Sequence, residues 1–196
     1  MRIFLTILTI VFSHTLFGQG FNNDQEYDKA DLDFLFAKSG IEVFKFSFLS
    51  KLDSGLNIKI EEYTNHKLTR KIDFYNELKP IIAMGDEPLS FTFPKLSDSI
   101  KQTIRFYLTK TKDKLTATVK TDKIQTQYKF SLKEIKLTQT RAFDSIPQLI
   151  NSKQPLFVFY GTKTGNMISC PGDDPVEKIA KTYDYVVAFY ADILKP

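Results

Sequence analysis

Residues 104–130 read IRFYLTKTKDKLTATVKTDKIQTQYKF, and this stretch decides the class of fold. Apolar residues occupy every second position in each of three short runs, a spacing typical of half-buried β-strands. Polar turns rich in Lys, Thr and Asp separate the runs. Placing Leu108 opposite Leu115, and Val119 opposite Ile124, keeps the apolar side chains on one face. The stretch therefore predicts an antiparallel β-meander.

The same alternation continues on both sides of this stretch. Upstream, it predicts strands at residues 44–48, 56–60, 68–74 and 89–93. Downstream, the apolar parity changes near residues 133–134, which predicts a bulge or bend. Residues 155–160 (PLFVFY) are continuously apolar, as in a strand covered on both faces. Together these runs indicate about eight strands.

The C-terminal residues 173–196 have the pattern of a helix. An Asp before a Pro is a favourable helix start. One apolar stripe of helical spacing then follows: Val176, Ile179, Ala180, Tyr183, Val186, Val187, Tyr190 and Leu194. We therefore expect an α+β fold, in which this helix covers one curved antiparallel sheet. A lipocalin-like β-barrel is the alternative.

The N-terminus has the pattern of a secretory signal peptide. Arg2 precedes an apolar run at residues 3–12, and a small residue, Gly18, follows a short polar stretch. We expect a signal peptide at residues 1–18, a flexible leader at 19–27 and a single globular domain at 28–196. With a lysine-rich composition typical of A+T-rich bacterial genomes, this predicts a soluble bacterial protein, exported to the periplasm or the medium.

The scarcity of reactive side chains narrows the chemistry. The chain has one cysteine, Cys170, and two histidines, of which His14 lies in the expected signal peptide. This excludes an intrachain disulfide and a four-cysteine zinc site. We expect no catalytic residues, no metal site and no cofactor, and Cys170 is interpreted as a structural thiol. The sequence does not decide whether the protein is an enzyme, and it favours a protein without enzyme activity.

Residues 159–166 (FYGTKTGN) resemble the phosphate-binding loop of flavodoxins, which holds FMN after the first strand of a parallel sheet. In that family four further parallel strands follow the loop, whereas here only one predicted helix follows. That helix begins at Asp173 and Asp174, and two carboxylates would repel a phosphate. We therefore interpret the stretch as a turn between secondary-structure elements.

The charge is unevenly distributed along the chain. Residues 89–172 carry 14 basic and 5 acidic side chains, whereas residues 20–88 carry 9 basic and 13 acidic ones. The outward positions of the predicted meander are rich in Thr, Gln and Lys. We predict a binding face there, formed by Arg105, Tyr107, Lys120, Lys123 and Lys129. A solvated surface whose lysines prevent edge association is the other interpretation.

Glu62 and Arg70 share the parity of the apolar face. With Tyr63 opposite Lys67, they become diagonal neighbours at the open end of a hairpin. We interpret them as a polar pair at the rim of the core or of a pocket.

The function expected is therefore that of a non-catalytic binding or interaction module. Its partner would be an anionic protein, a polysaccharide or a lipid headgroup surface, and not nucleic acid, because no stacking aromatics alternate with the lysines. Beyond the signal peptide, no segment is long and apolar enough to span a membrane. Two alternatives remain: a carrier of a small apolar ligand, with a pocket between sheet and helix near Ile60 and Ile72, and a carboxylate-based hydrolase.

Overall fold

The computed structural model describes residues 35–36, 38–51, 55–77, 99–121, 124–143, 152–166, 172 and 174–194. The predicted signal peptide and leader, the predicted strand at 89–93, Lys123 and Cys170 lie outside these ranges. The chain divides into two units, Met1–Ser39 and Gly40–Pro196. In the first unit, Leu35, Phe36 and Lys38 are helical. In the described part of the chain, no helix is long and apolar enough to cross a membrane.

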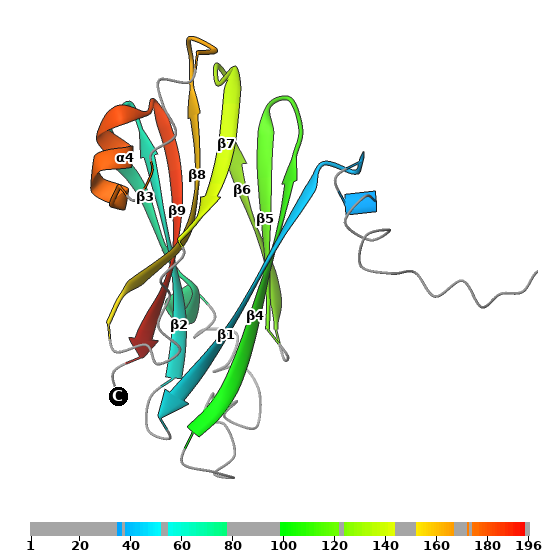
Figure 1. Cartoon of the computed structure of the whole chain (residues 1–196), viewed down its shortest axis with the longest axis vertical. Helices are drawn as coiled ribbons and strands as arrows, with labels where there is room; N and C mark the ends of the chain where they lie inside the picture. Colours follow the sequence, from blue (N-terminus) through cyan, green and yellow to red (C-terminus); the bar gives the residue numbers. More distant parts are fainter. Residues whose placement is uncertain are drawn as a thin grey trace, which may run out of the picture. The chain divides into compact units, whose positions relative to one another are not determined.

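Gly40–Pro196 contains two open antiparallel sheets (Figure 1). The four-stranded sheet has the order β1 (Ile41–Lys51), β4 (Ser99–Lys110), β5 (Lys114–Lys120) and β6 (Gln125–Ser131). The five-stranded sheet has the order β3 (Lys67–Asp73), β2 (Gly55–Thr64), β9 (Tyr185–Leu194), β8 (Gln154–Thr162) and β7 (Leu137–Ala142). A short helix, α4 (Val176–Thr182), precedes β9, and residues 74–77 after β3 are also helical.

The main core lies between the two sheets. Alternate residues of each strand point inward, as the period-two pattern requires, and large aromatic rings dominate the contacts. Phe157 and Phe189 of the five-stranded sheet stack at 4.3 Å between ring centroids. Phe106 of the four-stranded sheet meets them edge-on, at 5.0 and 5.7 Å. These three side chains have no exposed surface and join the two sheets.

A second, smaller core lies on the other face of the five-stranded sheet. There Val176, Ile179 and Tyr183 pack against buried side chains of β8 and β9, among them Tyr160 and Val186. The strands β8 and β9 are consequently buried on both faces. The continuous apolar run PLFVFY had indicated this arrangement for β8.

The predicted C-terminal helix is wrong in its extent. The helix covers only Val176–Thr182, and the remainder of the predicted stripe lies in β9. The physical reason is visible in Tyr185 and Phe189, which the helical stripe would have left facing solvent. As a strand covered on both faces, β9 buries them to 3% and 0% exposure, and it buries Val186 and Ala188 on its other face.

The single curved sheet and the lipocalin-like barrel are also wrong, because the chain forms two open sheets. β1 pairs with β4 rather than with β2, whereas the β4–β5–β6 meander and the β2–β3 hairpin keep the predicted neighbours. The bend predicted near residues 133–134 is confirmed. Glu134 has a left-handed backbone with φ of 73°, at the point where the chain leaves β6 and enters β7 of the other sheet.

In each predicted hairpin the strands are displaced by two residues from the predicted register, except next to the β2–β3 turn, where the displacement is one residue. Leu108 lies opposite Ala117 instead of Leu115. Ile72 lies opposite Ile60 rather than Ile58, because the turn has two left-handed residues, Asn65 and His66, and a bulge between Glu62 and Tyr63 displaces the register by one more residue. A shift of two preserves which face is apolar, so the pattern alone did not distinguish these registers.

Candidate functional site

The outer face of the four-stranded sheet carries the predicted basic surface. The inward positions of β4 and β5 are buried, for example Phe106 and Val119, which directs Arg105 and Lys120 outward. Arg105 and Tyr107 are half-buried, whereas Lys120 and Lys129 are exposed. We call this surface the basic face, and define it as Lys45, Arg105, Tyr107, Lys120 and Lys129 with the Thr and Gln side chains between them.

Strand pairing aligns three cations in one row across the basic face. Lys45 of β1 is the register partner of Arg105 in β4, and Arg105 is the partner of Lys120 in β5. Adjacent strands are about 4.8 Å apart, so the row spans about 10 Å. Lys45 was missed by the sequence interpretation, because the pairing of β1 with β4 joins residues 60 positions apart.

The next two rows are polar and uncharged apart from Lys129 and the apolar residues Ile41 and Val43. Tyr107 lies between Val43 and Thr118, in the row next to the cations. Lys129 lies opposite Thr116, one row further along. Among the described outward-facing strand residues of this sheet there is no Asp or Glu. The row therefore concentrates positive charge on this face.

Glu62 and Arg70 are direct register partners rather than diagonal neighbours, and their side chains contact different groups. The Glu62 carboxylate accepts a hydrogen bond of 2.7 Å from the Tyr185 hydroxyl. Burial, and then this carboxylate, raise the pKa of Tyr185. Arg70 donates to the Lys129 carbonyl at 3.4 Å and lies over the Phe130 ring, 5.7 Å from its centroid. Arg70 thus bridges β3 and β6 at one side of the sandwich.

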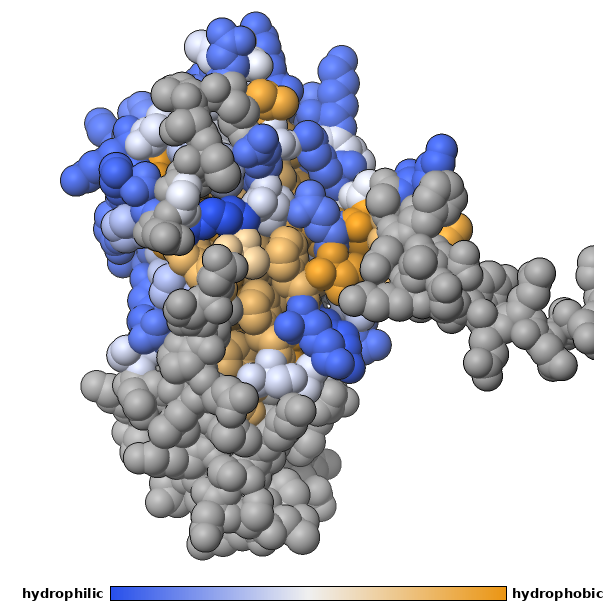
Figure 2. Space-filling view, viewed as in Figure 1, coloured by the Kyte–Doolittle hydropathy of each residue, from blue (hydrophilic) through white to orange (hydrophobic). Residues whose placement is uncertain are grey.

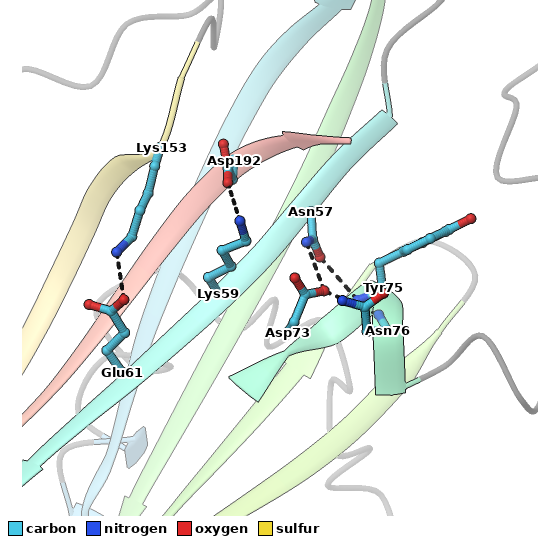
Figure 3. A network of polar contacts seen from close by, with 8 residues as sticks. All are labelled: Asn57, Lys59, Glu61, Asp73, Tyr75, Asn76, Lys153 and Asp192. Carbon is cyan, nitrogen blue, oxygen red and sulfur yellow. Dashed lines mark hydrogen bonds and ion pairs between the residues drawn. The ribbon is translucent and has the colours of Figure 1, made fainter. Parts of the chain in front are cut away.

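A polar network that the sequence did not indicate occupies the outer face of the five-stranded sheet (Figure 3). At its centre, Glu61 is only 8% exposed. Its carboxylate accepts hydrogen bonds from Lys153 at 2.7 Å and from the Tyr63 hydroxyl at 2.8 Å. Burial opposes ionisation of Glu61, but these hydrogen bonds outweigh it and lower the pKa.

Two tyrosines adjoin Glu61. The Lys153 ammonium lies 3.8 Å above the centroid of the Tyr190 ring. Burial, and then Glu61, raise the pKa of Tyr190. Burial and the hydrogen bond to Glu61 raise the pKa of Tyr63 to about 12.

Further along the same face, Lys59 forms an ion pair with Asp192, and Asn57 connects to the end of β3. The Asn57 amide donates to Asp73 at 2.9 Å, and its oxygen accepts from the Tyr75 backbone N–H at 3.0 Å. These bonds satisfy the buried Asn57 side chain and hold the chain where it leaves β3. We therefore interpret this network as one that stabilises the fold.

His66 stands at the tip of the β2–β3 hairpin, and its Nδ1 lies 3.3 Å from the Ala180 carbonyl oxygen. In the described ranges, no cluster of three or more His, Cys, Asp or Glu side chains could hold a metal ion.

The flavodoxin-like stretch has a different setting from the loop it resembles. β8 is antiparallel to both β7 and β9, whereas a flavodoxin loop follows a parallel strand. After β8, the Lys163 backbone N–H donates to the Asp184 carboxylate at 2.8 Å. The Asp184 carboxylate therefore accepts from a backbone N–H group that a bound phosphate would use.

Ile60 and Ile72 do not face α4, so they do not line the predicted pocket between sheet and helix. Both side chains are at most 2% exposed and belong to the core between the sheets, not to the core beneath α4. In comparisons with protein-family models, curated proteins and solved structures, no match to this chain was found.

Proposed function

We propose that this chain is an exported, non-catalytic binding protein that holds an anionic polysaccharide on its basic face. The observation that carries the proposal is the row formed by Lys45, Arg105 and Lys120 on three adjacent strands. Cations on three adjacent strands concentrate positive charge on this face, and a negatively charged partner would complement it.

The uncharged residues around the row favour a polysaccharide over a protein or a membrane. Protein interfaces have a core of aromatic and apolar side chains from which charges are depleted. Here cations, hydroxyls and amides occupy the centre, and the apolar contribution of the described side chains comes from Val43, 39% exposed, and from the half-buried Ile41 and Tyr107. Threonine and glutamine side chains can bond to sugar hydroxyls, and a tyrosine ring offers an apolar surface to a sugar ring.

Individual contacts on such a surface are weak. Exposed ion pairs contribute about 0.2–1 kcal/mol each, and salt screens them over a Debye length of about 10 Å at 0.1 M. We therefore expect modest affinity for a single short segment, increased by repeated attachment along a polymer. Binding should weaken strongly as salt concentration rises.

A charge-reversal experiment tests the proposal. The chain carrying Lys45→Glu, Lys120→Glu and Lys129→Glu is compared with the parent for retention on immobilised polyuronate and on neutral dextran. The parent should be retained by the polyuronate at low salt and released at high salt. The variant should not be retained, although its melting temperature should be close to that of the parent, because all three side chains are exposed.

A matched control reverses three exposed lysines elsewhere, Lys67, Lys133 and Lys181. It changes net charge equally, so it separates a local surface from general charge attraction. Equal loss in both triple variants would reject the basic face. Binding of the parent to anionic vesicles instead of polyuronate would reject the polysaccharide while leaving the face as the binding surface.

Export is part of the proposal and has its own test. Cleavage after Gly18 would give a mature chain that begins at Gln19. The intact mass of protein recovered outside the cytoplasm measures this directly. A mass corresponding to a start at Met1 would contradict it.

A further inference from the structure

β1 is a long and regular edge strand. It has eleven residues, Ile41–Lys51, and all eleven pair with β4 in one continuous register. Within the described ranges, no strand pairs with its other side. Natural sheets usually protect such edges with a bulge, a proline, a short strand or charged side chains. β1 is long and has no bulge or proline, and Lys45 is the one charged residue between Phe44 and Phe48, so among the described residues its second side can accept another strand.

Apolar side chains are partly exposed along this edge. Phe44 and Phe46 are half-buried and stack on Phe157 of the opposite sheet, at centroid distances of 4.4 and 6.0 Å. Figure 2 shows an apolar strip between hydrophilic side chains, where β1 passes the five-stranded sheet. An added strand would need apolar side chains on its inward positions to cover this strip.

The other described edges differ from β1. β3 and β7 contain no phenylalanine, and β7 has six residues. The Lys129 carbonyl of β6 accepts a hydrogen bond from Arg70, which partly covers that edge. β1 itself carries the complementary pattern, with Phe44, Phe46 and Phe48 alternating with smaller or polar residues.

We propose that two copies of this chain pair through β1, antiparallel, about a two-fold axis at Phe46. This register places Phe44 opposite Phe48 of the second copy, and Lys45 opposite its Ser47. A shift of the axis to Lys45 would place two lysines opposite each other, and a shift to Phe44 would place Glu42 against Phe46. The axis at Phe46 avoids opposed charges and places every one of the three phenylalanines opposite a phenylalanine, whereas an axis at Ser47 would leave Phe44 opposite Ser50.

Pairing with a second copy also gives a closed assembly of two chains. A two-fold contact uses the same strand twice and ends there, whereas pairing of β1 with a different edge would continue into a filament. The two four-stranded sheets would join into one sheet of eight strands. The two basic faces would then lie side by side on one surface.

A charge swap at Ser47 tests the register. Ser47 is exposed, and its hydroxyl contacts Thr103 at 3.2 Å on the outer face. In the dimer, Ser47→Lys opposes a lysine to Lys45 twice, so the dissociation constant should rise about fivefold. Ser47→Glu creates two opposite-charge pairs, and the constant should fall by a similar factor. Sedimentation equilibrium over a dilution series of the purified chain measures both.

The matched control makes the same two changes at Ser152, an exposed serine that also makes one side-chain hydrogen bond. Neither change should alter the dissociation constant. A chain that stays monomeric at every concentration would overturn the proposal. A dimer that responds equally at Ser47 and Ser152, or that does not respond at Ser47, would place the contact elsewhere and overturn it too.

Discussion

Replacement of Phe189 tests the two-sheet core directly. Phe189 is fully buried in β9, stacks on Phe157 and meets Phe106 and Phe130 edge-on. Truncation of a buried phenylalanine to alanine costs about 3–5 kcal/mol. Because three aromatic contacts are lost together, we expect Phe189→Ala to cost about 4 kcal/mol. That is a large part of the 5–15 kcal/mol typical of a domain.

Urea denaturation of parent and variant measures the free energy of unfolding, and a thermal scan should show a fall of about 8–16 °C. Phe189→Leu keeps most of the volume and should cost about 1.5 kcal/mol. Leu68→Ala, at a side chain 42% exposed, should change stability by less than about 0.5 kcal/mol. A loss below about 1 kcal/mol for Phe189→Ala would refute the reasoning, since it would mean that Phe189 faces solvent, as a C-terminal helix would have placed it.

Three further outcomes follow from single contacts. Gly161→Ala should cost about 1–3 kcal/mol, because a Cβ there would lie 2.6 Å from the Ile135 side chain; a variant that melts with the parent would contradict this. The lowered pKa of Glu61 stabilises the fold above pH 4.5 and loses that effect as pH falls through the folded pKa. Lys153→Met should therefore shift acid unfolding to higher pH, and an unchanged acid midpoint would show that the ion pair has no effect. Because the pKa of Tyr63 is raised to about 12, its protonated hydroxyl stabilises the fold below pH 10, and this contribution is lost as pH rises through 12. Tyr63→Phe should accordingly lose less stability than the parent over that range, measured by unfolding at each pH.

The basic face illustrates how far local pattern reaches. Alternation in β4, β5 and β6 assigns Arg105, Lys120 and Lys129 to the outward face, and the structure agrees. Period two determines the face of each residue without any knowledge of its partners. The same pattern does not say which strand lies beside which, so Lys45 and the row it completes were not predicted.

The C-terminal segment shows where a pattern is ambiguous. Residues 185–191 read YVVAFYA, and a strand buried on both faces and a buried helix are both continuously apolar there. Because Pro175 belongs to a favourable helix start, the whole apolar stripe after it was interpreted as one helix, although the helix ends at Thr182. The burial of Phe189, which the helical stripe left on the wrong face, is the signal that favours a strand.

The sequence by itself determined the antiparallel β class, the outward direction of the cations, the double burial of β8 and the bend at Glu134. These depend on side-chain alternation and backbone preference, which are local properties. Only the tertiary structure decided the division into two sheets, the pairing of β1 with β4 and of β2 with β9, the two-residue register shifts and the network around Glu61. Those depend on contacts between distant residues, whose free energy comes from covering two faces at once, and several pairings satisfy the same local pattern.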